Sequence, residues 1–193
     1  MKASDSIVPA RRAFLGNAGK ATLSVAAIAL LAGNDALAQG ATAGMQDVNI
    51  LNVALGLEHE AINAYQIGAQ SGLLTKPVLD VAVLFQSHHK GHRDALVATI
   101  RKMGGMPVAA KSMDEYVKAL NAAAIKSQAD ILELAARLEL GATNAYLGVI
   151  PAFKDAGLAK VAGRLAADET MHWSILANAL GKPIPMAALT FGA

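Results

Sequence analysis

The chain has no cysteine among its 193 residues. Disulfide frameworks, thiolate metal sites and cysteine nucleophiles are therefore excluded. Aromatic residues are also scarce, at 4%, whereas hydrophobic residues make up 54%. Much of this apolar content is alanine and leucine, which are strong helix formers. Since the sequence also has no glycine-rich phosphate loop and no strand-like alternation, it favours an all-α protein, and its length suits one domain.

The first 38 residues have the pattern of an export signal. Arg11 and Arg12 precede an apolar stretch over about residues 21–32, and Ala36-Leu37-Ala38 offers a small-residue cleavage site. This stretch is shorter than the roughly 20 residues of a membrane-spanning helix. The segment resembles a bacterial twin-arginine signal peptide. The resemblance implies recognition by the twin-arginine export machinery and a periplasmic or otherwise exported protein after cleavage, while an uncleaved N-terminal anchor is the alternative.

The charge balance changes when this segment is set aside. Of the 17 cationic and 15 anionic side chains, four and two respectively lie within residues 1–38, which leaves 13 of each. A neutral remainder without a basic patch gives no reason to expect a nucleic-acid partner.

Apolar residues recur with a period of 3.6 in four long segments, which predicts four helices. They lie at about residues 47–72, 77–103, 123–149 and 155–180. A capping-box pattern at 112–115 opens a further helical segment, either a separate short helix or the front of the third long helix. Residues 39–46 are expected to form a loose tether, 47–182 the bundle, and 183–193 a surface tail.

The connection between the second and third long helices could run the length of a bundle. Such a crossover joins two antiparallel hairpins in ferritin-like folds. We therefore expect an all-α four-helix bundle with a long crossover after its second helix.

The two predicted hairpins repeat a motif. Residues 57–65 read LEHEAINAY and residues 138–146 read LELGATNAY, so six of nine positions match. In the second helix of each hairpin, His89-x-x-His92 corresponds to Glu169-x-x-His172. The spacing from Glu58 to His92 is 34 residues and that from Glu139 to His172 is 33. The repeat indicates two related halves.

The repeated polar residues fall on the apolar faces of their helices. Glu58 lies between Leu57 and Ala61 in the apolar stripe, and Glu139 lies likewise between Leu138 and Ala142. A carboxylate that faces a helical core is costly unless it is paired, protonated or bound to a cation. Metal coordination is the interpretation that accounts for all six candidates: Glu58, His89, His92, Glu139, Glu169 and His172.

This set resembles the di-iron carboxylate pattern of ferritin-like proteins. In that pattern, two helices each supply one Glu and the other two each supply Glu-x-x-His. Glu58, Glu139 and Glu169-x-x-His172 match it, over a resemblance that covers about residues 47–180. The resemblance implies iron as the cofactor, as one or two ions, with manganese or zinc also compatible with carboxylate and imidazole ligands.

His89 departs from the family pattern, because it replaces a carboxylate that usually bridges the two metals. A dinuclear site, a single-metal site and a site with a weakly held second metal all remain open. His89 could also hydrogen-bond a carboxylate instead of binding metal.

Several neighbouring residues have less specific interpretations. Tyr65 and Tyr146 each follow an inward Glu by seven residues and are expected to be core aromatics with hydrogen-bonded hydroxyls. His88 lies at the edge of its apolar stripe, and His59 and Glu60 are expected at the surface.

Two functions are compatible with the sequence. The first is a metal-dependent oxidoreductase or iron-handling protein that acts on peroxide, oxygen or ferrous ion, since the short loops leave little room for a larger substrate site. The second is a non-catalytic exported bundle with a structural or lost metal site, acting in envelope stress or as an interaction module. The apolar C-terminal residues (Met186, Leu189, Phe191) would permit a homo-oligomer.

Overall fold

The computed structural model describes residues 43–192, so the predicted signal peptide (1–38) and part of the predicted tether lie outside the described residues. Within this range the chain forms five α-helices and two short 3-10 helices, and no strand. They are α3 (Ala43–Gln70), α4 (Lys76–Lys102), α5 (Met113–Ala119), η2 (Ala122–Ala124), α6 (Gln128–Val149), η3 (Ile150–Ala152) and α7 (Ala156–Ala179). The prediction of an all-α bundle is confirmed.

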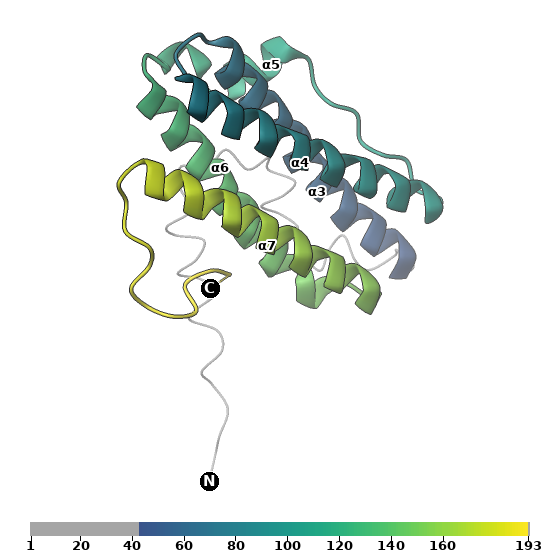
Figure 1. Ribbon diagram of the computed structural model, residues 1–193. Coiled ribbons are helices and arrows are strands. Elements are labelled where there is room, and N and C mark those ends of the chain that lie inside the picture. The colour runs from purple at the N-terminus through teal and green to yellow at the C-terminus, as the bar shows by residue number, and fades with distance from the viewer. Residues whose placement is uncertain (1–42, 193) are drawn as a thin grey trace.

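The four long helices form two antiparallel hairpins, α3 with α4 and α6 with α7, which contact each other mainly through α3 and α6. The segment that follows α4 runs back along the bundle and leads into α5 (Figure 1). It is held to α3 by Asn52, whose Nδ2 donates to the Met106 carbonyl (3.0 Å) and whose Oδ1 accepts from the Val108 N–H (2.8 Å). This segment is the long crossover expected between the hairpins.

The second helix of each hairpin ends in the same way. After α4, the Gly104 and Gly105 N–H groups donate to the carbonyls of Arg101 and Ile100, at 3.0 and 2.9 Å. After α7, the Gly181 and Lys182 N–H groups donate to Asn178 and Ala177, both at 2.9 Å. These are Schellman motifs, which need a left-handed residue, and Gly104 and Gly181 have φ of 77° and 67°. The structural repeat thus extends to the helix ends.

Two helix starts differ from the sequence-based boundaries. The third long helix begins at Gln128 instead of near residue 123, because the Ser127 side chain accepts from the Asp130 N–H and caps it. Its predicted first turn is the separate helix η2, which follows a left-handed Asn121. α5 is likewise a separate short helix, closed by a capping box between Ser112 and Glu115. At the other end of the chain, α3 already begins at Ala43, four residues before the expected start of the bundle.

The core has two apolar layers separated by a polar layer. One layer contains Leu51, Leu55, Leu96, Ile100 and Leu165, among others. The other contains Tyr65, Phe85, Leu132, Ala135 and Leu176. Between them in all four helices lie buried acidic and histidine side chains: Glu58, His89, Glu139, Glu169 and His172.

A buried carboxylate in α3 also fixes the start of α7. Asp47 is 2% exposed, and its Oδ1 and Oδ2 accept from the N–H groups of Lys154 and Asp155, at 2.9 and 3.1 Å. Asp155 in turn accepts from the Gly157 N–H and caps α7. Asp47 therefore joins one hairpin to the helix start of the other.

The residues after α7 return to the bundle. The Gly192 N–H donates to Asn144 Oδ1 at 2.8 Å, and the Phe191 ring packs edge-on against Trp173 with centroids 5.2 Å apart. No helix between residues 43 and 192 combines the length and the apolar character that a membrane crossing requires.

We predict that Asp47→Ala lowers the free energy of unfolding by about 2–3 kcal/mol, since it removes a charged acceptor and leaves two backbone N–H groups without one. Urea unfolding followed by circular dichroism measures the change. Asp80→Ala is the matched control, because Asp80 is exposed and forms a surface pair with Lys76 one turn away, a kind of pair worth less than about 1 kcal/mol. Equal losses in the two variants would contradict the anchoring role of Asp47.

Candidate metal centre

The six residues expected at the metal site lie together in the polar layer of the core. Glu58 comes from α3, His89 and His92 from α4, Glu139 from α6, and Glu169 and His172 from α7. All except His92 are at most 2% exposed. The i, i+3 spacing within α4 and within α7 places both residues of each pair on one helix face. The structure therefore brings the whole predicted set into one buried cluster.

The cluster contains two overlapping groups, each with ligand atoms within 4.8 Å of one another. The first group is Glu58, His89, His92 and Glu169, and the second is His89, Glu139, Glu169 and His172. His89 and Glu169 belong to both. Each group also has its own carboxylate and its own imidazole, as expected for two related halves.

His92 and His172 present the same nitrogen to the interior. His92 Nδ1 lies 3.3 Å from Glu169 Oε1 and 3.6 Å from Glu58 Oε2. His172 Nδ1 lies 3.2 Å from Glu169 Oε2 and 3.5 Å from Glu139 Oε2. The two oxygens of Glu169 thus face different histidines, which is the arrangement that a bridging carboxylate requires.

His89 lies between the two groups. Its Nδ1 is 2.8 Å from Glu58 Oε2, and its Nε2 is 3.1 Å from Glu139 Oε1. One ring nitrogen therefore faces each group, although an imidazole cannot bridge through two oxygens as a carboxylate does.

Each of the two repeated tyrosines donates a hydrogen bond to the glutamate of the other hairpin. The Tyr65 hydroxyl on α3 donates to Glu139 on α6, and the Tyr146 hydroxyl on α6 donates to Glu58 on α3. Both tyrosines are buried. They are core aromatics with bonded hydroxyls, as expected, and each orients the carboxylate of the opposite repeat.

Two further residues contact the outward nitrogens of the histidines. His92 Nε2 lies 3.2 Å from Asp168 Oδ2, and His172 Nε2 lies 2.9 Å from His88 Nδ1. Metal-binding histidines commonly use such outer contacts to fix ring orientation. Sequence reasoning did not identify Asp168, although its position next to Glu169 was a usable signal, and it placed His88 only at the edge of the helix face.

Three buried polar atoms of the cluster have no hydrogen-bond partner: His92 Nδ1, Glu139 Oε2 and Glu169 Oε1. Leaving such atoms unpaired in a core is costly. His92 Nδ1 and Glu169 Oε1 lie on the side of the first group, and Glu139 Oε2 lies in the second. Carboxylate oxygens and imidazole nitrogens are suitable ligands for iron, manganese or zinc. The cluster could therefore hold a metal ion, and its unpaired atoms are placed where one would bind.

Protons counter the carboxylate charge when no metal is present. Burial lowers the pKa of His92, but the neighbouring carboxylates of Glu169 and Glu58 raise it more, to about 10. The pKa of His89 is raised well above its ordinary value in the same way, by Glu139 and Glu58. Burial raises the pKa of Glu58, but His89 and His92 together lower it by a larger amount. The net pKa of Glu58 is therefore below its ordinary value. Burial dominates at Glu169, whose pKa is raised. The metal-free cluster is thus a network of carboxylates and protonated imidazoles.

The fold and this cluster define a ferritin-like helical bundle with a potential metal site. The ferritin-like domain family matches residues 46–182, and the chain belongs to that family. A similar solved structure is the crystal structure of a conserved hypothetical protein, rv2844, from Mycobacterium tuberculosis. The two share 22% identity with a TM-score of 0.60, over 77% of this chain and 99% of that one. At this identity the likeness shows the fold alone. A comparison with curated proteins gives no match.

We predict that the metal-free protein loses stability as pH rises from about 6.5 to 10. The folded-state pKa of His92, about 10, exceeds its ordinary value of 6.5. The contribution of His92 to the free energy of unfolding is therefore complete below pH 6.5 and is lost as pH approaches 10. Urea unfolding in EDTA at several pH values measures the trend, and His92→Gln should reduce its slope. A flat or rising stability between these pH values would contradict the protonated network.

Proposed function

We propose that the protein is an exported iron-binding member of the ferritin-like family that oxidises ferrous ion, with peroxide or oxygen as electron acceptor. The observation that carries this proposal is the pair of overlapping ligand groups, whose three unpaired atoms are distributed over both groups. Sharing of the Glu169 carboxylate would keep two ions close together. A pair of ferrous ions supplies two electrons when bound, which with two protons convert one hydrogen peroxide to two waters.

The protein's own residues would hold and neutralise the ions. The inward Nδ1 atoms of His92 and His172 lie beside different oxygens of Glu169, so each group offers a mixed nitrogen and oxygen set. Bound metal would displace the protons that those imidazoles carry, which makes binding weaker at low pH.

The surroundings of the cluster support a small substrate. Five of the six residues are carboxylates and imidazoles that are at most 2% exposed, deep in the bundle: Glu58, His89, Glu139, Glu169 and His172. On the α4–α7 side, the His92 side chain is 11% exposed and contacts Asp168, which is 52% exposed. An exposed carboxylate beside a ligand histidine is a favourable place for a cation to enter. Ferrous ion, peroxide and oxygen are small enough to pass.

A second candidate is a non-catalytic exported bundle, with a structural or lost metal site, that acts in envelope stress or as an interaction module. His89 favours it, since both of its nitrogens already contact carboxylates, at 2.8 and 3.1 Å. A protonated imidazole in that position satisfies Glu58 and Glu139 without a metal.

We predict about two iron ions per chain after anaerobic loading and dialysis of the full-length protein, measured by elemental analysis. Glu58→Gln and Glu139→Gln each alter one group and should leave about one ion. Glu169→Gln alters both groups and should leave less than one. Loaded wild-type protein should oxidise ferrous ion with peroxide at least tenfold faster than the Glu169→Gln variant.

Glu133→Gln is the matched control on α6, because Glu133 is exposed and pairs with Lys182 outside the cluster. It should keep the wild-type stoichiometry and rate. Wild-type protein with no stoichiometric metal would favour the non-catalytic candidate. Metal binding without oxidation, followed by a gain of activity in His89→Glu, would show that His89 holds the site in a structural role.

Export is tested separately through the twin-arginine pair. We predict that the chain expressed in a bacterium with this pathway is recovered in the periplasm with Gln39 as its first residue, by fractionation and mass spectrometry. Replacing Arg11 and Arg12 by Lys should leave uncleaved chain in the cytoplasm, because the pathway reads the arginine pair. Unchanged export of the variant would contradict this route, and a retained N-terminus on exported chain would favour an anchor.

A further inference from the structure

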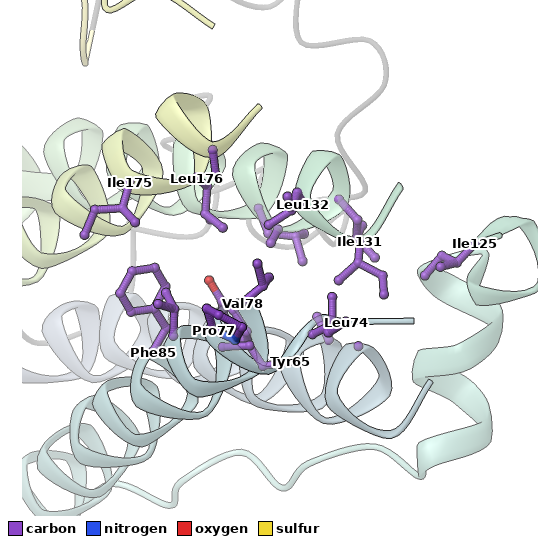
Figure 2. Close-up of a pocket in the computed structure, with 18 residues that line it drawn as sticks. Tyr65, Leu74, Pro77, Val78, Phe85, Ile125, Ile131, Leu132, Ile175 and Leu176 are labelled. Carbon is purple, nitrogen blue, oxygen red and sulfur yellow. The ribbon is translucent and has the colours of Figure 1, made fainter. Parts of the chain in front are cut away.

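A cavity of about 230 Å³ lies between the two hairpins, at the end of the bundle where α3 connects to α4. Figure 2 shows Val78, Leu132 and Leu176 around it, from α4, α6 and α7 respectively. Ile125, which follows η2, lies at one side. The cavity is formed where the facing sides of the two hairpins do not fill the space between them.

The wall of the cavity is apolar. Among the residues that the structure describes, no charged side chain lines it. The hydroxyl of Tyr65 is a polar group at the wall, and it is already engaged as a donor to Glu139. A charged ligand would lose its hydration without gaining a partner here, whereas a hydrocarbon surface would lose nothing. The chemistry of the wall therefore selects an uncharged, hydrocarbon-like molecule.

The volume of the cavity also suits a small molecule. An apolar cavity of about 150 Å³ in another protein stays dry and binds benzene. A cavity of 230 Å³ has room for a somewhat larger ring or a short alkyl chain. The cavity is partly open to solvent, since its lining includes Ile175, which is 43% exposed, so a small molecule could enter it.

The inner wall of the cavity is shared with the metal centre. The Phe85 ring lies against the His172 ring, with centroids 4.1 Å apart and an interplanar angle of 26°. The Tyr65 ring stacks on His89 with centroids 5.5 Å apart, and its hydroxyl donates to Glu139. Only the Phe85 ring would therefore separate a molecule in the cavity from His172. Only Tyr65 would separate it from His89 and Glu139.

We propose that this cavity is a binding site for a small uncharged hydrocarbon-like molecule, seated against the outer faces of Tyr65 and Phe85. The site does not depend on the proposed iron chemistry, because its lining contains none of the candidate metal ligands. A bound molecule would lie against Tyr65 and Phe85, the two rings that contact Glu139, His89 and His172.

Binding of toluene to the metal-free full-length protein tests this site, with benzoate as a charged probe of similar shape. Calorimetric titration and the thermal midpoint measure binding, since a ligand specific to the folded state raises the midpoint. We expect saturable toluene binding with a dissociation constant below about 1 mM, and at least tenfold weaker binding of benzoate.

Two variants place the ligand in the cavity. Ala82→Phe adds a ring at the cavity wall from α4, and Ala179→Phe does so from the exposed end of α7. Each should weaken toluene binding at least tenfold. Val83→Phe is the matched control, because Val83 adjoins Ala82 but is 52% exposed and outside the lining. It should bind as the wild type does.

The proposal is overturned if the wild type does not bind toluene, or if benzoate binds equally well. It is also overturned if the folded Ala82→Phe and Ala179→Phe variants retain wild-type affinity. Circular dichroism establishes which variants are folded. If either Ala82→Phe or Ala179→Phe does not fold, the other variant provides the test. Loss of iron binding with retained toluene binding would contradict the proposed function and leave this site standing.

Discussion

Three carboxylates buried in one helical core are the constraint on which the rest of this structure depends. Glu58, Glu139 and Glu169 are at most 2% exposed and lie between two apolar layers that exclude water. Charges in such a place need partners, since the penalty for burying them unpaired exceeds the net stability of most domains. This need for partners explains why imidazoles and tyrosine hydroxyls surround the three carboxylates.

The pseudo-twofold repeat explains how the partners are supplied. Each hairpin carries an inward Glu and a tyrosine, but each tyrosine donates to the Glu of the other hairpin. Glu169 on α7 likewise contacts His92 on α4. Histidines of the same hairpin also contact these carboxylates, as His89 does Glu58, but the cluster is complete only when both hairpins contribute, so docking of the hairpins and completion of the cluster are coupled. Asp47 adds a second link of this kind at the start of α7.

The fold and the membership of the cluster were readable from the sequence because both depend on spacing. A period of 3.6 and a repeat with nearly equal Glu-to-His separations place six residues at one level of a bundle, whatever their rotamers. Helix ends at Gly104 and Gly181 were equally readable, since a Schellman motif needs a left-handed residue.

What could not be predicted depends on contacts between segments far apart in the chain. The sequence suggested Asp47 only as a helix start, but its carboxylate accepts from backbone groups more than 100 residues away. Spacing also cannot decide which histidine nitrogen faces inward, and so did not identify Asp168 and His88 as the outer contacts. The start of α6 was misplaced because three alanines favour helix locally, whereas the extended backbone at Ile125 ends that turn and the Ser127 cap begins a new helix.

His89 sets the charge of the centre. The family pattern has four carboxylates, which balance two divalent cations, whereas this chain supplies three carboxylates and a third imidazole. With neutral imidazoles the same two cations would leave one net positive charge in a buried site. A less negative set of ligands stabilises the lower oxidation state of a bound metal. Such a set also binds a second cation less tightly. In a metal-loaded centre, His89 would therefore act on occupancy and redox potential together, so the number of ions bound and the ease of their oxidation should change in step when residue 89 is altered.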